Sequence, residues 1–229
     1  MKESKKVLMS DPSILTIIAM PSQEPFIDLV NFDPDIVVDQ SLANRSQYFS
    51  FVRLSVAKKL SLAKNFLPKD IRFFIKEGYR SLDIQEIAFK RSLQRVKENS
   101  PYQDLDYLIA EASKYVAPPN VAPHPTGGAV DLTLIDSDGI ELDLGTPFDA
   151  IPHETDNATF FDATNISIEA IQNRQILAHA LQSVGFVNYY TEWWHWSYGD
   201  KYWAVMNDVD EALYNHVTDE DLLDLLQEA

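Results

Sequence analysis

The sequence contains no cysteine, which excludes disulfide bonds, thiolate metal ligands and cysteine nucleophiles together. Any metal held by side chains of this protein must therefore take histidine and carboxylate ligands. Glycine is also scarce, at 7 residues, yet Gly127 and Gly128 stand side by side three residues after a histidine. Glycines at such a point let a loop approach other groups closely.

Basic residues are few: 19 lysines and arginines stand against 35 aspartates and glutamates, for a formal charge of -16. Such a charge repels nucleic-acid phosphates and anionic lipid, so the composition excludes nucleic-acid and membrane-surface partners. Long apolar runs are missing as well, since no stretch reaches the roughly 18 residues of a membrane span. Near the start, only residues 14–20 are continuously apolar, which disfavours a signal peptide. We expect a soluble protein in the cytoplasm rather than the periplasm; no pattern specifies its oligomeric state.

The 229 residues suit one domain, and 45% of them are apolar, with no repeat or low-complexity tract. We therefore predict a single domain over residues 1–229. Residues 1–45 contain four prolines and are predicted to be irregular. Within residues 207–229, Thr218 and the acidic residues after it predict a short C-terminal helix opened by a capping box.

Apolar residues at helical spacing predict three longer helices, and Ser167 is suited to cap the last of them. Alternating or aromatic-rich runs predict strands and hairpins. The expected fold is α+β, a central antiparallel sheet flanked by helices. The helices are expected over 52–66, 81–97 and 167–184, a buried strand over 72–75, one hairpin over 129–144 and two further strands within 193–206.

Two places in the sequence carry candidate metal ligands. His124 lies in a proline- and glycine-rich loop, and Asp131 follows it within an apolar strand. Glu192 and His195 are three residues apart, so a regular strand would send them to opposite faces and the chain must bend between them. With such a bend, His124, Asp131 and His195 can meet at one metal ion, with Glu192 beside it.

Two imidazoles and one carboxylate leave the fourth position of a tetrahedral Zn²⁺ open, and zinc lowers the pKa of a water bound there from about 15.7 towards about 7. Glu192 would then serve as general base and pass the proton to the leaving amine. Arg80, at a predicted strand-to-helix junction, would stabilise the oxyanion that develops on the attacked carbonyl. The pattern predicts hydrolysis at a zinc site with one ion per chain.

Each residue also has a simpler interpretation when it is taken alone. A histidine in a loop such as that of His124 is more often a surface residue, and Asp131 could belong to a buried salt bridge. Glu192 and His195 could be a hydrogen-bonded pair at the edge of a core. The conjunction of all four favours the metal site.

These residues resemble the motifs of the D-alanyl-D-alanine dipeptidases, the VanX-type zinc D,D-peptidases. The resemblance extends over roughly residues 50–205 and implies zinc at His124, Asp131 and His195, with Glu192 as base and Arg80 as transition-state stabiliser. It further implies that Asp149 binds the free amino group of the substrate and that D-Ala-D-Ala is cleaved to two D-alanines. The matching segments are Gly78-Tyr79-Arg80, Ala122 to Asp131 with its His124-Pro-Thr-Gly-Gly-Ala-Val-Asp core, Gly145-Thr-Pro-Phe-Asp149 and Glu192-Trp-Trp-His195.

One position departs from the family pattern, because Ala122 stands where the family has a serine expected to contact substrate. Without that contact, the sequence predicts the class of reaction more firmly than the identity of the substrate. The alternatives are a D,D-carboxypeptidase or cell-wall endopeptidase acting on longer peptides, and a homologue that binds zinc without catalysis. For Arg80 and Asp149, the simpler interpretations are a structural salt bridge and a turn cap. A carboxylate that pairs with a free ammonium, as proposed for Asp149, would select dipeptides.

Overall fold

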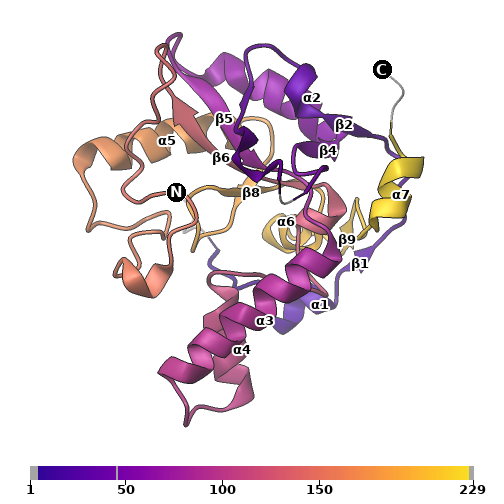
Figure 1. Cartoon of the computed structure of the whole chain (residues 1–229), viewed down its shortest axis with the longest axis vertical. Coiled ribbons are helices and arrows are strands. Elements are labelled where there is room, and N and C mark those ends of the chain that lie inside the picture. The colour runs from indigo at the N-terminus through magenta and orange to yellow at the C-terminus, as the bar shows by residue number, and fades with distance from the viewer. Residues whose placement is uncertain (1–4, 45, 227–229) are drawn as a thin grey trace.

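A five-stranded sheet runs through the centre of the computed structural model, which describes residues 5–44 and 46–226 (Figure 1). One edge pair, β3 with β5, is parallel, and the other neighbouring strands are antiparallel. The predicted α+β fold is confirmed, with a sheet that is mixed at one edge. In spatial order the strands are β3 (Val37–Val38), β5 (Arg72–Glu77), β6 (Ala129–Ile135), β8 (His195–Ser197) and β7 (Val187–Asn188).

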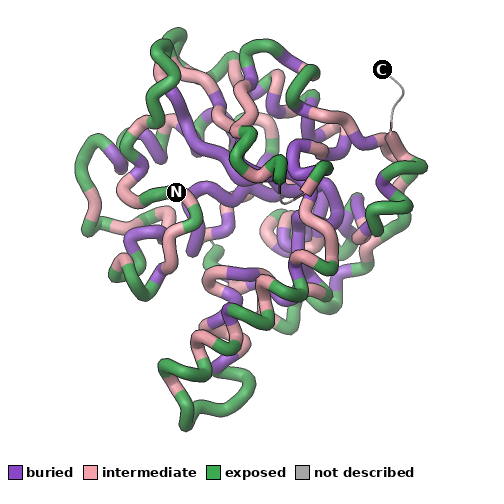
Figure 2. Tube along the Cα trace, in the orientation of Figure 1, coloured by how far each residue is buried: buried purple, intermediate pink, exposed green. Residues whose placement is uncertain are grey.

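Strand β6 lies in the middle of this sheet, and all seven of its residues are buried (Figure 2). Its apolar side chains, such as Leu132 and Leu134, enter the main core, where side chains of α2 (Leu54–Ala63) and α5 (Ile168–Gln182) also lie. Because successive residues of a strand point to opposite faces, Asp131 faces away from this core. The central strand thus carries one carboxylate on its other face.

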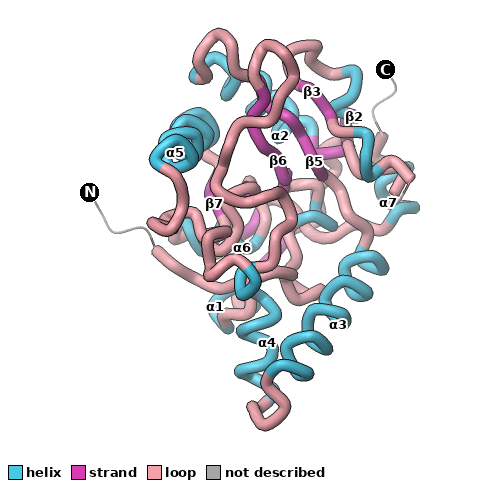
Figure 3. The backbone as a smooth tube through the Cα atoms, turned by 60° about the vertical axis from the view of Figure 1, so that its left-hand side comes forward, coloured by secondary structure: helices cyan, strands magenta, loops and turns pink. Residues whose placement is uncertain are grey.

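On that other face, two antiparallel helices, α3 (Leu82–Asn99) and α4 (Leu105–Ser113), pack on each other and project from the body (Figures 1 and 3). Helix α3 begins directly after β5, with Ser81 as its N-cap. The start of α3 therefore lies at the end of the strand that leads into the site. No helix in the described part of the chain is long and apolar enough to cross a membrane.

The predicted helices are confirmed to within a few residues at their ends. The helix expected over 52–66 is α2 followed by a short 3-10 turn, and that over 81–97 is α3. Ser167 caps α5 through the amide of Ala170, as expected. Helix α7 (Asp219–Asp224) begins with the predicted capping box between Thr218 and Asp221, while residues 227–229 lie outside the described residues.

The prediction that residues 193–206 form two strands is wrong for the second half, which is helix α6 (Lys201–Met206). Gly199, with φ of 77°, turns the chain, and Asp200 caps the helix by accepting the amide of Trp203 at 2.8 Å. The fully buried Tyr202 then packs into a second core. Tertiary packing here overrides the strand preference of aromatic residues.

The hairpin predicted over 129–144 forms its turn but not its return strand. A single bridge joins Ile135 to Glu141, and then Asp143 draws the chain away by accepting the amide of Gly145 and the hydroxyl of Ser167. Helix α4 is an element that the sequence analysis did not predict.

Residues 5–44 are less irregular than predicted. They contain two short helical turns besides helix α1 (Pro12–Leu15), and they supply strand β3 to the central sheet. Two further strands of this segment pair with distant parts of the chain: β1 (Ile18–Ala19) with β9 (Glu211–Ala212), and β2 (Phe26–Asp28) with β4 (Phe51–Arg53). The segment is therefore part of the domain.

The loop over residues 143–163 is held to the body by the buried guanidinium of Arg174. Its nitrogens donate to the carbonyl oxygens of Leu144 at 2.8 Å, Ala158 at 2.7 Å and Phe160 at 2.5 Å. Buried carbonyl groups are costly when they lack a hydrogen-bond donor. Arg174 thus fixes the loop that also carries Asp149.

We predict that Arg174→Met lowers the free energy of unfolding by about 2–4 kcal/mol, because three carbonyls, two of them in buried hydrogen bonds, lose a charged donor at once. Urea unfolding followed by circular dichroism measures this change. The exposed Arg91 supplies a control, since Arg91→Met should change stability by less than about 0.5 kcal/mol. Equal stability of the two variants would show that the loop is held by other contacts.

Candidate metal centre and active-site pocket

Three neighbouring strands place three acidic or imidazole side chains in one row across the sheet. Asp131 of β6 pairs in register with Glu77 of β5 on one side and with His195 of β8 on the other. The register shifts between Ile75 and Glu77, as expected of a β-bulge, and this irregularity brings Glu77 opposite Asp131. The row exists only because the register is fixed at this point.

His124 reaches the same point from a 3-10 turn, η4 (His124–Thr126), that leads into β6. Gly127 follows with φ of 72°, and a Cβ there would lie 2.2 Å from a ring carbon of Phe26, so no other residue fits. The Nδ1 atom of His124 donates to the carbonyl oxygen of Gly78 at 2.6 Å. This hydrogen bond leaves Nε2 of His124 directed at Asp131, 3.4 Å from its Oδ1.

The bend predicted between Glu192 and His195 is confirmed. The amide of His195 donates to the carbonyl of Glu192 at 3.2 Å, which closes a turn. The side-chain amide of Asn188 donates to the carbonyls of Glu192 and His195, each at 2.9 Å. With the turn held in this way, Nδ1 of His195 lies 2.9 Å from Oδ1 of Asp131.

The predicted ligands His124, Asp131 and His195 thus converge, with one ligand atom from each lying within 4.8 Å of the others. All three are at most 4% exposed, so His124 is not the surface residue that its loop suggested. Burial alone would raise the pKa of Asp131, but the two imidazoles outweigh it and lower that pKa, so the carboxylate stays ionised. The simpler interpretation of Asp131 as a member of a buried salt bridge is only partly supported. The nearest guanidinium nitrogen, Arg80 Nη2, lies 3.9 Å from the carboxylate, which is a long distance for an ion pair.

The donor chemistry of this cluster fits a divalent cation. Because Gly78 accepts the Nδ1 proton of His124, Nε2 of a neutral His124 turns a lone pair towards an ionised carboxylate oxygen. Two acceptors that face each other repel unless a proton or a cation lies between them. Two imidazole nitrogens and one carboxylate oxygen are a ligand set that Zn²⁺ and related metals take.

Arg80 lies at the strand-to-helix junction as predicted, but its main partner, Glu77, was not identified from the sequence. Arg80 Nε donates to Glu77 at 2.9 Å, Nη2 makes a second, shorter bond to the same carboxylate, and Nη1 donates to Gln85 at 3.1 Å. Burial opposes the charge, but Glu77 and Asp131 together raise the pKa of Arg80. The guanidinium is therefore held in a fixed position, fully charged, beside Asp131.

Glu192 lines the same pocket and is 8% exposed, and its carboxylate makes no hydrogen bond to another described residue. Burial first, and then the charges of Asp131 and Asp149, raise its pKa well above the usual value, against the opposing effect of Arg80. It is not hydrogen-bonded to His195, so the simpler interpretation of these two residues as a structural pair does not apply.

Asp149 lies at the rim of the pocket, with an exposed side chain that accepts a hydrogen bond from the Tyr115 hydroxyl at 3.1 Å. The pKa of Asp149 is raised, first because surrounding protein atoms displace water and then because the negative charges of Asp131 and Glu77 lie nearby. Arg80 and the hydrogen bond from Tyr115 act in the opposite direction and do not cancel the increase. The side chain accepts from a phenol rather than from a turn amide, so the turn-cap alternative is not what is seen. Tyr115 had no signal in the sequence, because the helix before it was not predicted.

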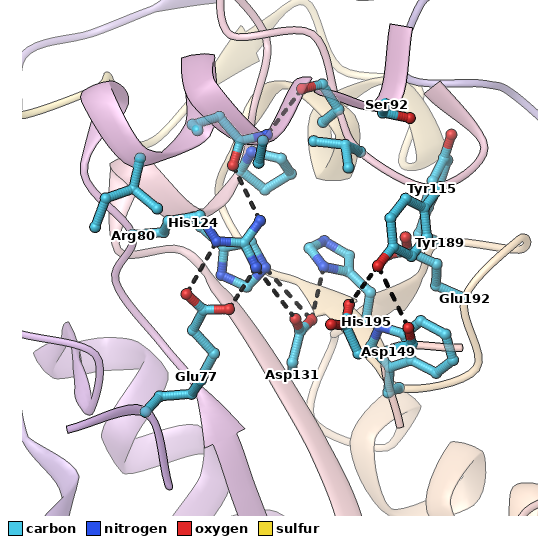
Figure 4. A pocket seen from close by; sticks show the side chains of 18 of the residues that line it. Glu77, Arg80, Ser92, Tyr115, His124, Asp131, Asp149, Tyr189, Glu192 and His195 are labelled. Atoms are coloured by element: carbon cyan, nitrogen blue, oxygen red, sulfur yellow. Dashed lines mark hydrogen bonds and ion pairs between the residues drawn. The ribbon is translucent and has the colours of Figure 1, made fainter. Parts of the chain in front are cut away.

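The loop with Asp149 and the turn with Glu192 are joined directly. The indole nitrogen of Trp193 donates to the hydroxyl of Thr146 at 2.9 Å, and Phe148 packs edge to face on Trp194. Two motifs far apart in the sequence therefore position each other. Around the metal cluster, Figure 4 shows Glu77 and Arg80 on one side and Tyr115, Asp149 and Glu192 on the other.

These residues line a cavity of about 540 Å³, whose other walls come largely from α3. Ala122, the departure from the family motif, is buried and is not among the lining residues; its carbonyl oxygen lies 2.8 Å from Nε2 of His216. His153 is exposed beside Glu154, and His179 contacts Phe66. Those three histidines remain outside the metal cluster.

The chain is similar in sequence to one family of known proteins. The model of the Peptidase M15 family described as D-ala-D-ala dipeptidase matches residues 42–219. A protein of Synechocystis sp. named D-alanyl-D-alanine dipeptidase is 29% identical over 198 residues, which cover 75% of this chain and 77% of that protein. One of the same name from Enterococcus faecalis is 35% identical over 129 residues, covering 55% of this chain and 61% of its own length. The solved structure of the LdcB LD-carboxypeptidase is 18% identical, with 92% of this chain and 81% of that chain covered and a TM-score of 0.43.

We predict that Asp131→Ala removes bound divalent metal completely, because Asp131 lies close to both imidazoles and a catalytic site has no spare ligand. His124→Ala and His195→Ala should act in the same way. Elemental analysis of the purified variants, with circular dichroism to verify folding, checks this expectation. A folded Asp131→Ala protein with full metal content would remove Asp131 from the ligand set.

Proposed function

The chain belongs to the D-ala-D-ala dipeptidase family, Peptidase M15, and on that basis we propose that it hydrolyses the dipeptide D-Ala-D-Ala with zinc as its metal. The observation that carries the proposal is the convergence of His124, Asp131 and His195 beside Glu192 in one pocket. A structural metal site would need neither an open cavity nor an unpaired carboxylate at its side. Members of this family are metallopeptidases, so the chain is an enzyme by membership.

Zinc is the proposed metal because two imidazoles and one carboxylate form the ligand set of many catalytic zinc sites. When bound, the ion would polarise the substrate carbonyl and lower the pKa of water. His124 is prepared for this role by its hydrogen bond to Gly78, which fixes its tautomer. The ionised state of Asp131 supplies negative charge to balance the cation.

Glu192 is the proposed general base. Its carboxylate is free of hydrogen bonds to the described residues, so it can accept a proton from water in the pocket. A raised pKa makes a carboxylate a stronger proton acceptor, and the same group can then protonate the leaving amine. Both proton transfers require that Glu192 lie on one side of the scissile bond, close to both the water and the amine.

Arg80 is the proposed stabiliser of the charge that develops on the attacked carbonyl oxygen. Its bidentate contact with Glu77 and its bond to Gln85 hold the guanidinium before substrate arrives. Preorganised charge of this kind does not need to reorient during the reaction. Glu77 contributes indirectly, because its carboxylate holds the Arg80 guanidinium in position.

Asp149 is the proposed partner of the substrate ammonium group, with Tyr115 holding its carboxylate in place. A free amino group would then be required of good substrates. One observation favours the alternative of a D,D-carboxypeptidase: the cavity of about 540 Å³ is within the range of pockets that hold drug-sized ligands, and Asp149 lies exposed at its rim. Longer peptides would fit if the rim does not exclude them.

We predict that Glu192→Gln keeps its metal and its fold but loses turnover by about 10²–10⁴-fold, because an amide has the same shape and cannot take the proton. Steady-state assays of D-alanine release, with metal content measured on the same samples, test this. Glu86→Gln, on an exposed part of α3, is the matched control and should be fully active. Turnover near the wild-type rate in Glu192→Gln would assign the base to another group.

The second expectation concerns substrate choice: free D-Ala-D-Ala should be cleaved much faster than its N-acetyl form, and Asp149→Asn should narrow that difference. Acetylation removes the ammonium charge and leaves the Asp149 carboxylate without its partner. The variant should also shift the acidic limb of kcat/KM to lower pH, since Asp149 is one of the charges that raise the pKa of Glu192.

Rate profiles over pH for both substrates, in both proteins, measure the two effects together. If wild-type enzyme cleaves the acetylated peptide as fast as the free one, the carboxypeptidase alternative replaces the dipeptidase proposal.

A further inference from the structure

One wall of the cavity is a face of α3, and it carries two arginines that the proposed reaction does not use. The residues of this face that line the cavity include Ile84, Ala88, Arg91 and Arg95. Arg91 and Arg95 are four positions apart, so they are neighbours on the same side of the helix. This end of the cavity is therefore basic, although acidic residues outnumber basic ones by 35 to 19 in the whole chain.

Neither of these two arginines has a partner of opposite charge. In the described part of the chain, neither guanidinium donates a hydrogen bond or forms an ion pair, and that of Arg95 lies over an aromatic ring. Other arginines are engaged differently: Arg53 and Arg174 donate to backbone carbonyls, and Arg80 donates to Glu77. The guanidinium groups on α3 thus keep their donors free for a group that enters the cavity.

The position of Arg95 is defined by Tyr115. The Cζ atom of Arg95 lies 5.8 Å from the centre of the Tyr115 ring, which is within the range of a cation–π contact. The hydroxyl of the same tyrosine donates to Asp149 at 3.1 Å. In the view of Figure 4, Tyr115 lies between Ser92 of α3 and Asp149. Arg95 and Asp149 therefore contact one tyrosine, Arg95 at its ring and Asp149 at its hydroxyl.

This shared contact indicates which part of a substrate would meet the arginines. Asp149 is the proposed partner of the substrate ammonium group, and that group is bonded to the same carbon atom as the N-terminal side chain. Arg95 is thus placed beside the N-terminal side chain rather than beside the leaving amino acid. D-Ala-D-Ala has only a methyl group there, and a cavity of about 540 Å³ has room for a longer side chain.

A simpler role for the two arginines would be to balance the acidic groups of the cavity. Those groups have other partners, however. Glu77 binds Arg80, Asp131 lies against two imidazoles, and Asp149 accepts a hydrogen bond from a tyrosine hydroxyl. An internal balance of charge therefore does not account for two further cations on α3.

We propose that Arg95, assisted by Arg91, binds a carboxylate on the side chain of the substrate's N-terminal residue. Acidic dipeptides such as D-Glu-D-Ala are then substrates besides D-Ala-D-Ala. A guanidinium presents a planar set of donors that matches the two oxygens of a carboxylate. This assignment rests on the proposed function, because it requires Asp149 to hold the ammonium group.

Hydrolysis of D-Glu-D-Ala compared with that of D-Gln-D-Ala is the test, because the two dipeptides differ in charge and scarcely in shape. We expect kcat/KM of wild-type enzyme to be about 10-fold higher for the glutamyl dipeptide, as for a charged hydrogen bond at a partly exposed site. Without the arginines, the acidic groups of the cavity would instead repel the glutamate and favour glutamine.

Arg95→Met should therefore lower the ratio of the two kcat/KM values to one or below. Arg91→Met should lower it less, because Arg91 is more exposed to solvent. Lys97→Met is the matched control: it removes the same charge from an exposed position of α3 outside the cavity, and it should leave the ratio unchanged. D-Ala-D-Glu and D-Ala-D-Gln, which carry the change on the C-terminal residue, should not show the preference for the acid.

Three results would overturn the carboxylate site while cleavage of D-Ala-D-Ala leaves the proposed function standing. They are a wild-type ratio within twofold of one, a ratio of wild-type size in Arg95→Met, and an equal preference for the acid at the C-terminal residue. The first comparison uses wild-type enzyme alone, so it does not depend on the folding of a variant.

Calorimetric titration of the Glu192→Gln protein with D-Glu-D-Ala and D-Gln-D-Ala separates the two proposals. Wild-type enzyme that cleaves none of these dipeptides would overturn the proposed function. Tighter binding of the glutamyl dipeptide, lost when Arg95→Met is added, would still support the carboxylate site, and equal binding of the two dipeptides would overturn it.

Discussion

The buried carboxylate of Asp131 is the group on which the rest of the site depends. It stands in the central strand of the sheet, and an ionised carboxylate in such a place is costly unless positive charge or hydrogen-bond donors surround it. His124, His195 and Arg80 are brought towards it from three different parts of the chain. The same negative charge that would hold a cation also raises the pKa of Glu192. Metal binding at this cluster and the basicity of Glu192 would thus both depend on one residue.

The sheet gives this arrangement its precision. Glu77, Asp131 and His195 are paired residues of three adjacent strands, and a shift of one residue in the register would send a side chain to the opposite face. Outside the sheet, the groups that adjust the site come from turns: Gly78 fixes the tautomer of His124, and Asn188 holds the turn between Glu192 and His195. The paired strands set the distances between these side chains, while the turns set the orientation of the histidine rings and of Glu192.

Sequence reasoning could single out the candidate ligands because their residue types are unusual for their surroundings, as with Asp131 within an apolar strand and His195 among tryptophans. It could not identify Glu77 or Tyr115, whose roles depend on a β-bulge and on a helix that local periodicity did not indicate. Residues 201–206 show the same limit in another way. Their aromatic composition favours a strand, but the cap by Asp200 and the burial of Tyr202 make a helix. Long-range packing decided each of these cases.

We propose that this protein hydrolyses D-Ala-D-Ala only when a metal is held by His124, Asp131 and His195. Release of D-alanine by the purified protein, measured before chelation, after chelation and during titration with zinc, tests it most directly. We predict that chelation abolishes release and that activity returns in full at one equivalent of zinc per chain. Undiminished release by protein verified to be free of metal would contradict it.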